Sequence, residues 1–187
     1  MGLATIGQVL SHLQRENRLV VHVLIDGQEP DLTQMPSVRR LPVCDHTLFI
    51  ETADPRQLVD GVLSEVLVQL AEADRFRGEA CDLMLSNQNQ KAMEKLSGCF
   101  AIWQSAQESV LQTGRLLRLD LDAVMVDGVS LMKMLLQFAQ QLRDIKTALE
   151  NRDFVGLGDI LNYEAPQSSK RWHEAITTLR GLVASLQ

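Results

Sequence analysis

The pattern of apolar positions along the chain changes its period near residue 53. Up to this residue, the apolar positions recur first with the spacing of a helix and then with the spacing of strands. After it, they recur at alternating spacings of three and four. Such heptad spacing is typical of long helices packed side by side at a shallow angle. The pattern therefore predicts a mainly α fold of α+β type: an antiparallel helical bundle over residues 54–187 and a small N-terminal helix and β-strand region over residues 1–53.

The N-terminal region is predicted to form one short helix and two strands. Thr5 and Gln8 have the spacing of a capping box that begins a helix. Residues 18–26 are rich in β-branched side chains and stop at an Asp-Gly turn, which predicts a strand, and residues 47–52 predict a second one. The prolines between the two strands favour an ordered loop over a tight hairpin.

Four apolar stripes predict the helices of the bundle. The first stripe follows the capping pair Asp54-Pro55 for about 30 residues, and Arg77 is its one interruption. In chain order the stripes are Val59, Leu63, Val66, Leu70, Ala73, Ala80 and Met84; Leu96, Cys99, Trp103, Ala106, Val110, Thr113 and Leu117; Leu131, Leu135, Phe138, Leu142, Ile145 and Leu149; and Trp172, Ile176, Leu179, Val183 and Leu186. The residues central to these stripes are expected in the shared core: Leu70, Trp103, Leu142 and Leu179.

Residues 23–27 and 124–128 share the pattern V-x-[IV]-D-G. One interpretation is coincidence combined with shared turn chemistry, and the other is that the two pieces lie in one small sheet. After the second piece, Ser130 is predicted to cap a helix. Asp153 is predicted to cap a further short helix that ends at Pro166.

Composition and charge narrow the class of protein. The 187 residues are 45% hydrophobic, 22% charged and 4% aromatic, as in soluble globular proteins. Basic residues number 18 and acidic residues 24, and no stretch concentrates the lysines and arginines that nucleic acids or anionic membranes attract. The first ten residues lack the regions of a secretory signal, and no apolar window is long enough to span a membrane. We therefore expect a cytoplasmic protein whose partners are neither nucleic acid nor membrane.

The sequence contains no motif of a known catalytic, cofactor or metal site in a qualifying context. Of three cysteines, Cys81 and Cys99 are interpreted as small buried apolar residues, and only Cys44 has polar neighbours, Asp45 and His46, that could tune a thiolate. We expect no catalytic residue, no cofactor, no metal ion and no disulfide.

Residues 152–164 read R-D-F-V-G-L-G-D-I-L-N-Y-E and lie between a long amphipathic helix and a helix that contains tryptophan. This segment resembles the pattern R-D-[FY]-V-x-L-x-D-x-L-x-Y-E of an uncharacterised family of bacterial helical proteins of planctomycete type. The resemblance covers the C-terminal third of the chain. It implies a bacterial, largely helical protein and carries no activity with it.

Two functional hypotheses follow. The first is a non-catalytic protein–protein interaction module, such as an adaptor, an assembly factor or a chaperone-like bundle, which binds a protein partner or a second copy of itself as a homodimer. Its candidate partner surface is the set of apolar residues outside the first stripe, Leu58, Val62, Leu67 and Val68. The alternative is a bundle that binds or transforms a small molecule at a site whose polar groups converge only in three dimensions.

Overall fold

The computed structural model describes residues 4–151 and 153–186. The chain divides into two compact units, Met1–Leu58 and Val59–Gln187. Helix accounts for 72% of the chain and is accompanied by two small antiparallel strand pairs. The predicted mainly α fold with a small β part is therefore confirmed.

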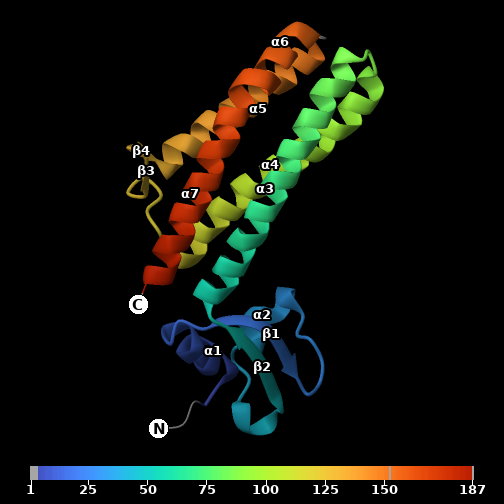
Figure 1. Cartoon of the computed structure of the whole chain (residues 1–187). Coiled ribbons are helices and arrows are strands. Elements are labelled where there is room, and N and C mark those ends of the chain that lie inside the picture. The colour runs from blue at the N-terminus through green and yellow to red at the C-terminus, as the bar shows by residue number, and fades with distance from the viewer. Residues whose placement is uncertain (1–3, 152, 187) are drawn as a thin grey trace. The chain divides into compact units, whose positions relative to one another are not determined.

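The first unit combines a helix with a two-stranded antiparallel sheet (Figure 1). Its main elements are α1 (Ile6–Arg15), β1 (Leu19–Ile25) and β2 (Leu48–Ala53). The Thr5 side chain accepts the N–H of Gln8, and the Gln8 side chain accepts the N–H of Thr5. The predicted capping box therefore begins α1.

β1 and β2 pair along their length except at one bulge. Val21 is the extra residue of this bulge on β1. At the end of β1, Asp26 and Gly27 both have positive φ, 53° and 80°. These are the conformations of a type I′ turn, which explains why the strand ends at an Asp-Gly pair.

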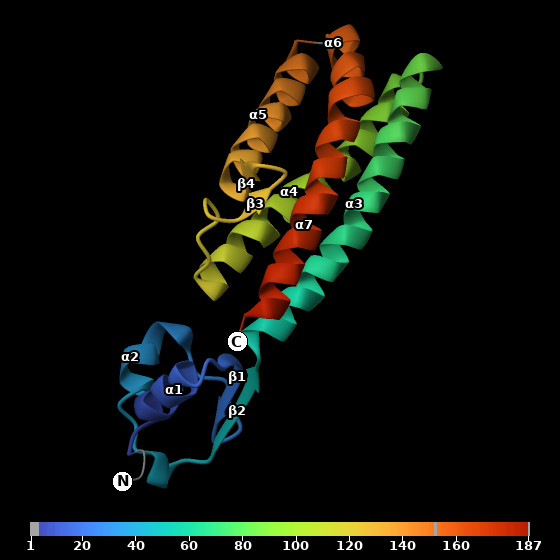
Figure 2. The ribbon, with the colours of Figure 1, turned by 60° about the vertical axis from the view of Figure 1, so that its left-hand side comes forward.

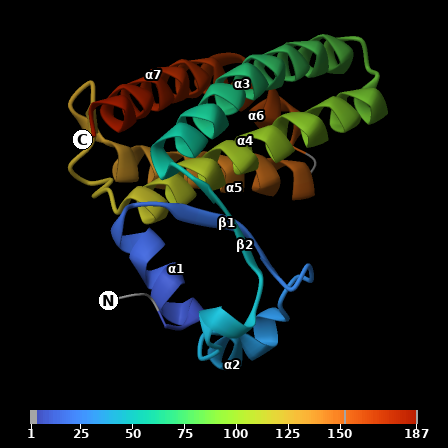
Figure 3. The same cartoon turned by 90° about the horizontal axis from the view of Figure 1, so that it is seen from below.

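The connection between the strands is an ordered loop, as predicted. It contains the short helical turns η1 (Leu32–Gln34), α2 (Met35–Val38) and η2 (Val43–Asp45). The N–H of Gly7 donates to the carbonyl of Arg39 at 2.9 Å, so the loop returns to the start of α1 (Figure 3). A Cβ atom at Gly7 would lie 2.8 Å from that carbonyl oxygen, so glycine is what allows the two backbones to approach.

The apolar core of the first unit is small. Among its described residues, the buried apolar side chains are Ile6 and Leu10 of α1 and Pro55 at the start of α3. On the strands, Val21 and Phe49 are each 55% exposed. A unit of this size has a high ratio of surface to volume, so few side chains can be enclosed completely.

The second unit is an antiparallel helical bundle (Figures 1 and 2). Its elements are α3 (Pro55–Leu85, whose first turn belongs to the first unit), α4 (Asn89–Leu117), α5 (Leu131–Glu150), α6 (Phe154–Asp159), the π-helical turn η3 (Ile160–Glu164) and α7 (Ala165–Ser185). The chain reverses between α3 and α4, and again between α5 and α6. None of the described helices combines the length and the apolar character needed to cross a membrane.

A short hairpin precedes α5. It consists of β3 (Met125–Val126) and β4 (Val129–Ser130) around Asp127 and Gly128, whose φ angles are 49° and 77°. This is the same type I′ turn that ends β1. β1 pairs with β2, and β3 pairs with β4 in a separate sheet. The hypothesis of one shared sheet is therefore wrong, and common turn chemistry accounts for the repeated pattern.

The apolar stripes meet in one core that runs through the bundle. Leu70, Trp103 and Leu179 are buried in it as predicted. Leu142 is only partly buried, so its predicted place in the core centre is wrong. On α5 the buried position at this level belongs to Gln141, which follows Phe138 at a spacing of three instead of four. Spacings of three and four both place a residue on the same helix face. Leu142 was expected in the core because leucine is apolar, but packing against the other helices buries Gln141 instead.

The helices after the hairpin begin at the predicted caps. Ser130 accepts the N–H of Lys133, and Asp153 accepts the N–H of Gly156. The prediction that Pro166 ends the second of these helices is wrong, because the chain continues from α6 through η3 into α7. Proline is tolerated in the first turn of α7 because its missing N–H coincides with the change of hydrogen-bond spacing at η3.

Candidate functional site

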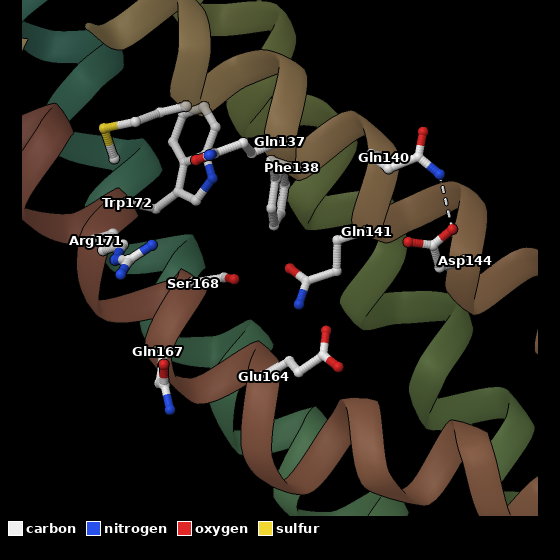
Figure 4. Close-up of a pocket in the computed structure, with 11 residues that line it drawn as sticks. Gln137, Phe138, Gln140, Gln141, Asp144, Glu164, Gln167, Ser168, Arg171 and Trp172 are labelled. Atoms are coloured by element: carbon white, nitrogen blue, oxygen red, sulfur yellow. Dashed lines mark hydrogen bonds between the residues drawn. The ribbon is translucent and has the colours of Figure 1, made fainter. Parts of the chain in front are cut away.

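A groove of about 390 Å³ lies in the second unit, between α5 on one side and η3 with α7 on the other (Figure 4). Its lining residues are Met134, Gln137, Phe138, Gln140, Gln141, Asp144, Glu164, Gln167, Ser168, Arg171 and Trp172. Most of these side chains are polar. The volume falls within the range of known ligand pockets, so this groove is the candidate functional site.

The floor of the groove is apolar and buried. The rings of Phe138 on α5 and Trp172 on α7 have centroids 5.1 Å apart, and Trp103 of α4 lies edge-on to Phe138 at 5.6 Å. Both tryptophans are buried, and Trp103 was expected in the core. Aromatic pairs at these separations attract one another, so they hold α4, α5 and α7 together beneath the groove.

Gln141 stands out in the groove because it is polar and buried. Its side chain is 9% exposed, and among the described residues its Oε1 atom has no hydrogen-bond partner. Figure 4 shows its amide pointing from α5 into the groove, toward Ser168 and Glu164. A buried amide oxygen without a donor costs about 1–3 kcal/mol. This oxygen can accept a hydrogen bond from a group that enters the groove.

The rim of the groove is exposed and carries charges of both signs. Arg171 of α7 supplies a guanidinium, and Asp144 of α5 and Glu164 of η3 supply carboxylates. Asp144 is held by the amide of Gln140, whose Nε2 donates to Oδ1 at 2.8 Å. Within the described chain the side chains of Arg171 and Glu164 have no hydrogen bond or ion pair. Both groups are therefore available to a bound molecule.

The π-helical turn places Glu164 at the groove. The N–H of Ala165 donates to the carbonyl of Ile160, five residues back, and Pro166 has no N–H to offer to the carbonyl of Leu161. Instead, Nη1 of Arg77 on α3 donates to the Leu161 carbonyl at 2.9 Å. The side chain from α3 thus satisfies the backbone group that the π turn and the proline leave unpaired.

A polar cluster inside the bundle holds Arg77 in this position. Asp74 lies one turn earlier on α3, with its Oδ1 3.7 Å from Nε of Arg77, and Ser169 of α7 donates to Oδ2 of Asp74 at 2.6 Å. Ser169 is buried. The three residues therefore connect α3 to α7 behind the groove and support the wall that carries Glu164.

The sequence contained one signal for this arrangement. Arg77 interrupts the first apolar stripe, and this interruption marks the place where a charged group enters the bundle. Gln141 gave no comparable signal, because a glutamine between apolar residues of an amphipathic helix is ordinarily exposed. Sequence reasoning therefore missed the residue that most distinguishes the groove.

The residues predicted as a partner surface belong to α3, and none of them lines the groove. Leu58 and Val62 are each 42% exposed and Val68 is 66% exposed, whereas Leu67 is partly buried against the core. At 100° per residue, Val68 lies on a different side of the helix from Leu58 and Val62. That these four residues bind a partner stays a prediction.

The cysteine with polar neighbours is Cys44. It is exposed, and its thiol donates to Oδ1 of Asp45 at 3.3 Å. This hydrogen bond and the nearby negative charge raise the pKa of Cys44 above its usual value. His46 is directed elsewhere, because its Nδ1 lies 2.7 Å from Oδ2 of Asp26 in the turn after β1. The arrangement thus favours the protonated thiol over the thiolate.

The other two cysteines, Cys81 and Cys99, are buried, as predicted, and their thiols are free. Burial raises the pKa of the Cys99 thiol to about 12 and also raises that of Cys81. Both thiols therefore stay protonated inside the bundle at neutral pH. Among the described residues, no group of three or more His, Cys, Asp or Glu side chains is arranged to hold a metal ion.

Comparison with known proteins identifies the region that contains the groove. Residues 78–175 match a family described as a domain of unknown function, DUF8042, and every residue that lines the groove lies within this range. Arg152, the first residue of the segment with the bacterial resemblance, lies outside the described residues. No curated protein and no solved structure gives a significant match to the chain. Because the matched range covers more than half of its length, the chain belongs to the family of this domain of unknown function.

Proposed function

We propose that this chain is a non-catalytic interaction module that binds another polypeptide through the groove between α5 and α7. The observation that carries the proposal is the buried Oε1 atom of Gln141, which lies in the groove with no donor in the described chain. A protein partner supplies this donor when one of its polar side chains enters the groove.

The shape and chemistry of the groove support a polypeptide as its occupant. Its floor of Phe138 and Trp172 is buried, whereas the rim residues Gln137 and Gln140 are exposed. A desolvated centre within a polar rim is the usual anatomy of a protein–protein interface. Neutral amides both donate and accept hydrogen bonds, so this rim matches the polar groups of a peptide.

A second candidate is a small polar molecule. The groove volume of about 390 Å³ is large enough for one, and Arg171 and Glu164 offer opposite charges at the rim. A ligand with both a carboxylate and an ammonium group would match these two residues. In this case also, Oε1 of Gln141 accepts a hydrogen bond from the bound molecule.

The test places a photo-crosslinking amino acid at Gln137, an exposed rim position, in the full-length chain expressed in its native host. We expect one polypeptide to be captured, and we expect Gln141→Leu to abolish that capture because the acceptor is lost. Gln112→Leu is the matched control, because this glutamine is exposed on α4 and bonds only Glu108.

The outcomes separate the two candidates. Capture that survives Gln141→Leu contradicts the groove as the binding surface. Absence of a captured polypeptide, together with a small molecule that leaves the purified protein on denaturation, supports the second candidate. Native mass spectrometry of wild type and Gln141→Leu would detect such a molecule and its loss.

We propose further that the chain is a bacterial, cytoplasmic protein that associates with a second copy of itself. The resemblance of residues 152–164 supports a bacterial, planctomycete-type origin, and three free cysteines suit a reducing cytoplasm. The exposed side chains of Leu58, Val62 and Val68 support association with a second copy. Sedimentation equilibrium at micromolar concentration tests the last point, and a monomer of 20.9 kDa at all concentrations would contradict it.

A further inference from the structure

The first unit contains a strand with an open edge. In the two-stranded sheet, β1 has β2 on one side and no other strand along its opposite side in the described chain. An edge strand presents unpaired N–H and C=O groups that can pair with a further strand.

The hydrogen bonds at the end of β1 show which groups face outward. The N–H of Asp26 donates to the carbonyl of Thr47, on the side of β2, whereas the N–H of Ile25 donates to the carbonyl of Gln28, on the opposite side. Successive residues of a strand direct their backbone groups to opposite sides. Val23 therefore directs its N–H and C=O away from β2, as Ile25 does.

The chain itself begins to pair with this edge and then stops. Gln28 forms an antiparallel bridge with Ile25. Two residues further along each strand, the partner of Val23 would be Pro30. Proline has no N–H to donate to the carbonyl of Val23, so the pairing cannot continue. No strand of the described chain pairs with the edge of β1 from Val23 toward Leu19.

A hollow of about 550 Å³ lies along this open edge. Its wall includes the whole run of residues 18–23, which shows that the strand edge itself faces the hollow, and Leu10, Pro30 and Met35 contribute further apolar side chains. The exposed Val21 of the bulge lies on the same wall. The first unit thus has an apolar surface next to free backbone groups.

The charges around the hollow favour an acidic occupant. Arg39 lines it with a guanidinium that has no hydrogen bond or ion pair in the described chain. Arg18 donates only to the neutral hydroxyl and carbonyl of Thr52. The single carboxylate of the lining is Glu29, and its Oε1 lies 2.8 Å from Nε2 of His22. The lining therefore contains two arginines whose guanidinium groups lack a carboxylate partner in the described chain, and one carboxylate, Glu29, that lies beside His22.

We propose that the open edge of β1 binds an extended acidic segment of a partner protein, which adds to the sheet as a further strand. Backbone pairing with Val23 provides the attachment, and Arg18 and Arg39 select acidic side chains. This surface lies in the first unit, and its function does not depend on the groove between α5 and α7.

The test uses the full-length chain and the capped heptapeptide Thr-Glu-Val-Glu-Val-Glu-Thr as a probe. We expect saturable binding and slower hydrogen exchange of the Val23 amide in the complex, because that N–H then donates to the peptide. A peptide with lysine in place of glutamate is expected to bind about tenfold more weakly. Equal affinity for the two peptides, or unchanged exchange at Val23, would overturn the proposal.

Two neighbouring arginines provide a matched pair of variants. Arg39→Glu is expected to weaken binding of the glutamate peptide about tenfold and to improve binding of the lysine peptide. Arg40→Glu changes the net charge equally, but Arg40 does not line the hollow, so it is expected to leave both affinities nearly unchanged. Equal effects of the two variants would show general charge attraction and contradict the site. A dimer in sedimentation equilibrium that the peptide fails to dissociate, with Val23 already protected, would assign the edge to a second copy and also overturn the proposal.

Discussion

Polar side chains inside the bundle differ in whether a partner satisfies them. Gln107 of α4 is half-buried and its Nε2 donates to the carbonyl of Leu135 at 3.3 Å, and Ser169 donates to Asp74. Oε1 of Gln141, on the helix next to α4, has no such partner. The two glutamines are therefore a matched pair in which one amide is hydrogen-bonded within the bundle and the other has an unpaired oxygen.

We predict that Gln141→Leu raises the free energy of unfolding by about 1 kcal/mol, because it removes an unpaired buried oxygen and keeps a similar volume. Gln107→Leu is expected to lower it by about 1 kcal/mol, because the hydrogen bond from Gln107 to the Leu135 carbonyl is lost. Urea unfolding of the full-length chain measures both values. A loss of stability in Gln141→Leu would mean that its amide has a structural role.

At the scale of helices, an ion pair connects α3 to α7. Nε of Arg180 donates to Oδ1 of Asp60 at 2.8 Å, and this hydrogen bond lowers the pKa of Asp60 below its ordinary value of 3.8. A carboxyl whose pKa is lower in the folded state stabilises the fold above its unfolded pKa. This contribution is lost as the pH falls through the pKa of the folded state.

We therefore predict that Asp60→Asn destabilises the chain at pH 7 and that the difference from wild type disappears in acid, below the ordinary aspartate pKa of 3.8. Both side chains are partly exposed, so the effect at pH 7 is expected to be small and to shrink with added salt. Chemical unfolding at several pH values measures the difference. A difference in the free energy of unfolding that stays constant with pH would show that the charge of Asp60 is not involved.

The π turn η3 also depends on a contact between helices. It requires one residue close in sequence and another on a different helix. Pro166 removes the backbone donor, and Arg77 replaces it at the Leu161 carbonyl. The two residues should therefore be coupled energetically, although they lie on different helices.

We predict that Arg77→Met costs about 1–3 kcal/mol in the wild-type chain and clearly less in a Pro166→Ala background. Alanine restores the N–H that can donate within the helix, so the Leu161 carbonyl no longer depends on α3. A double-mutant cycle measured by urea unfolding isolates this coupling, since the loss of the ion pair with Asp74 is common to both backgrounds. Additive effects would contradict the proposed role of Arg77.

For the whole molecule, the two units differ in how much apolar surface they enclose. The core of the second unit draws on α3, α4, α5 and α7, whereas the described buried apolar residues of the first unit are Ile6, Leu10 and Pro55. Regions with few buried apolar contacts open at a lower free energy. The open edge of β1 and the hollow beside it belong to the unit with the smaller core.

We predict that the amides of β1 and β2 exchange with solvent through openings that cost less free energy than those of α4. Hydrogen exchange of the full-length chain followed by mass spectrometry measures both. Equal protection in the two units would show that they unfold together. Added protection of the first unit by the acidic heptapeptide would link its stability to occupation of the strand edge.

Several features of this protein follow from the sequence by itself, because local interactions determine them. Thr5, Ser130 and Asp153 cap the helices they were predicted to begin, since a side-chain oxygen needs only the N–H groups of the next turn. The Asp-Gly pairs form type I′ turns because both positions require positive φ. The heptad stripes likewise indicate the bundle, since apolar periodicity shows which face of each helix is buried.

The groove was decided only by the tertiary structure. Leu142 and Gln141 are neighbours on α5, and packing against other helices determined which of them is buried. Arg77 and Leu161 are 84 residues apart, so no local pattern could indicate that one would complete the hydrogen bonding of the other. A buried polar group depends on partners brought together from distant parts of the chain, whereas caps, turns and stripes depend on near neighbours.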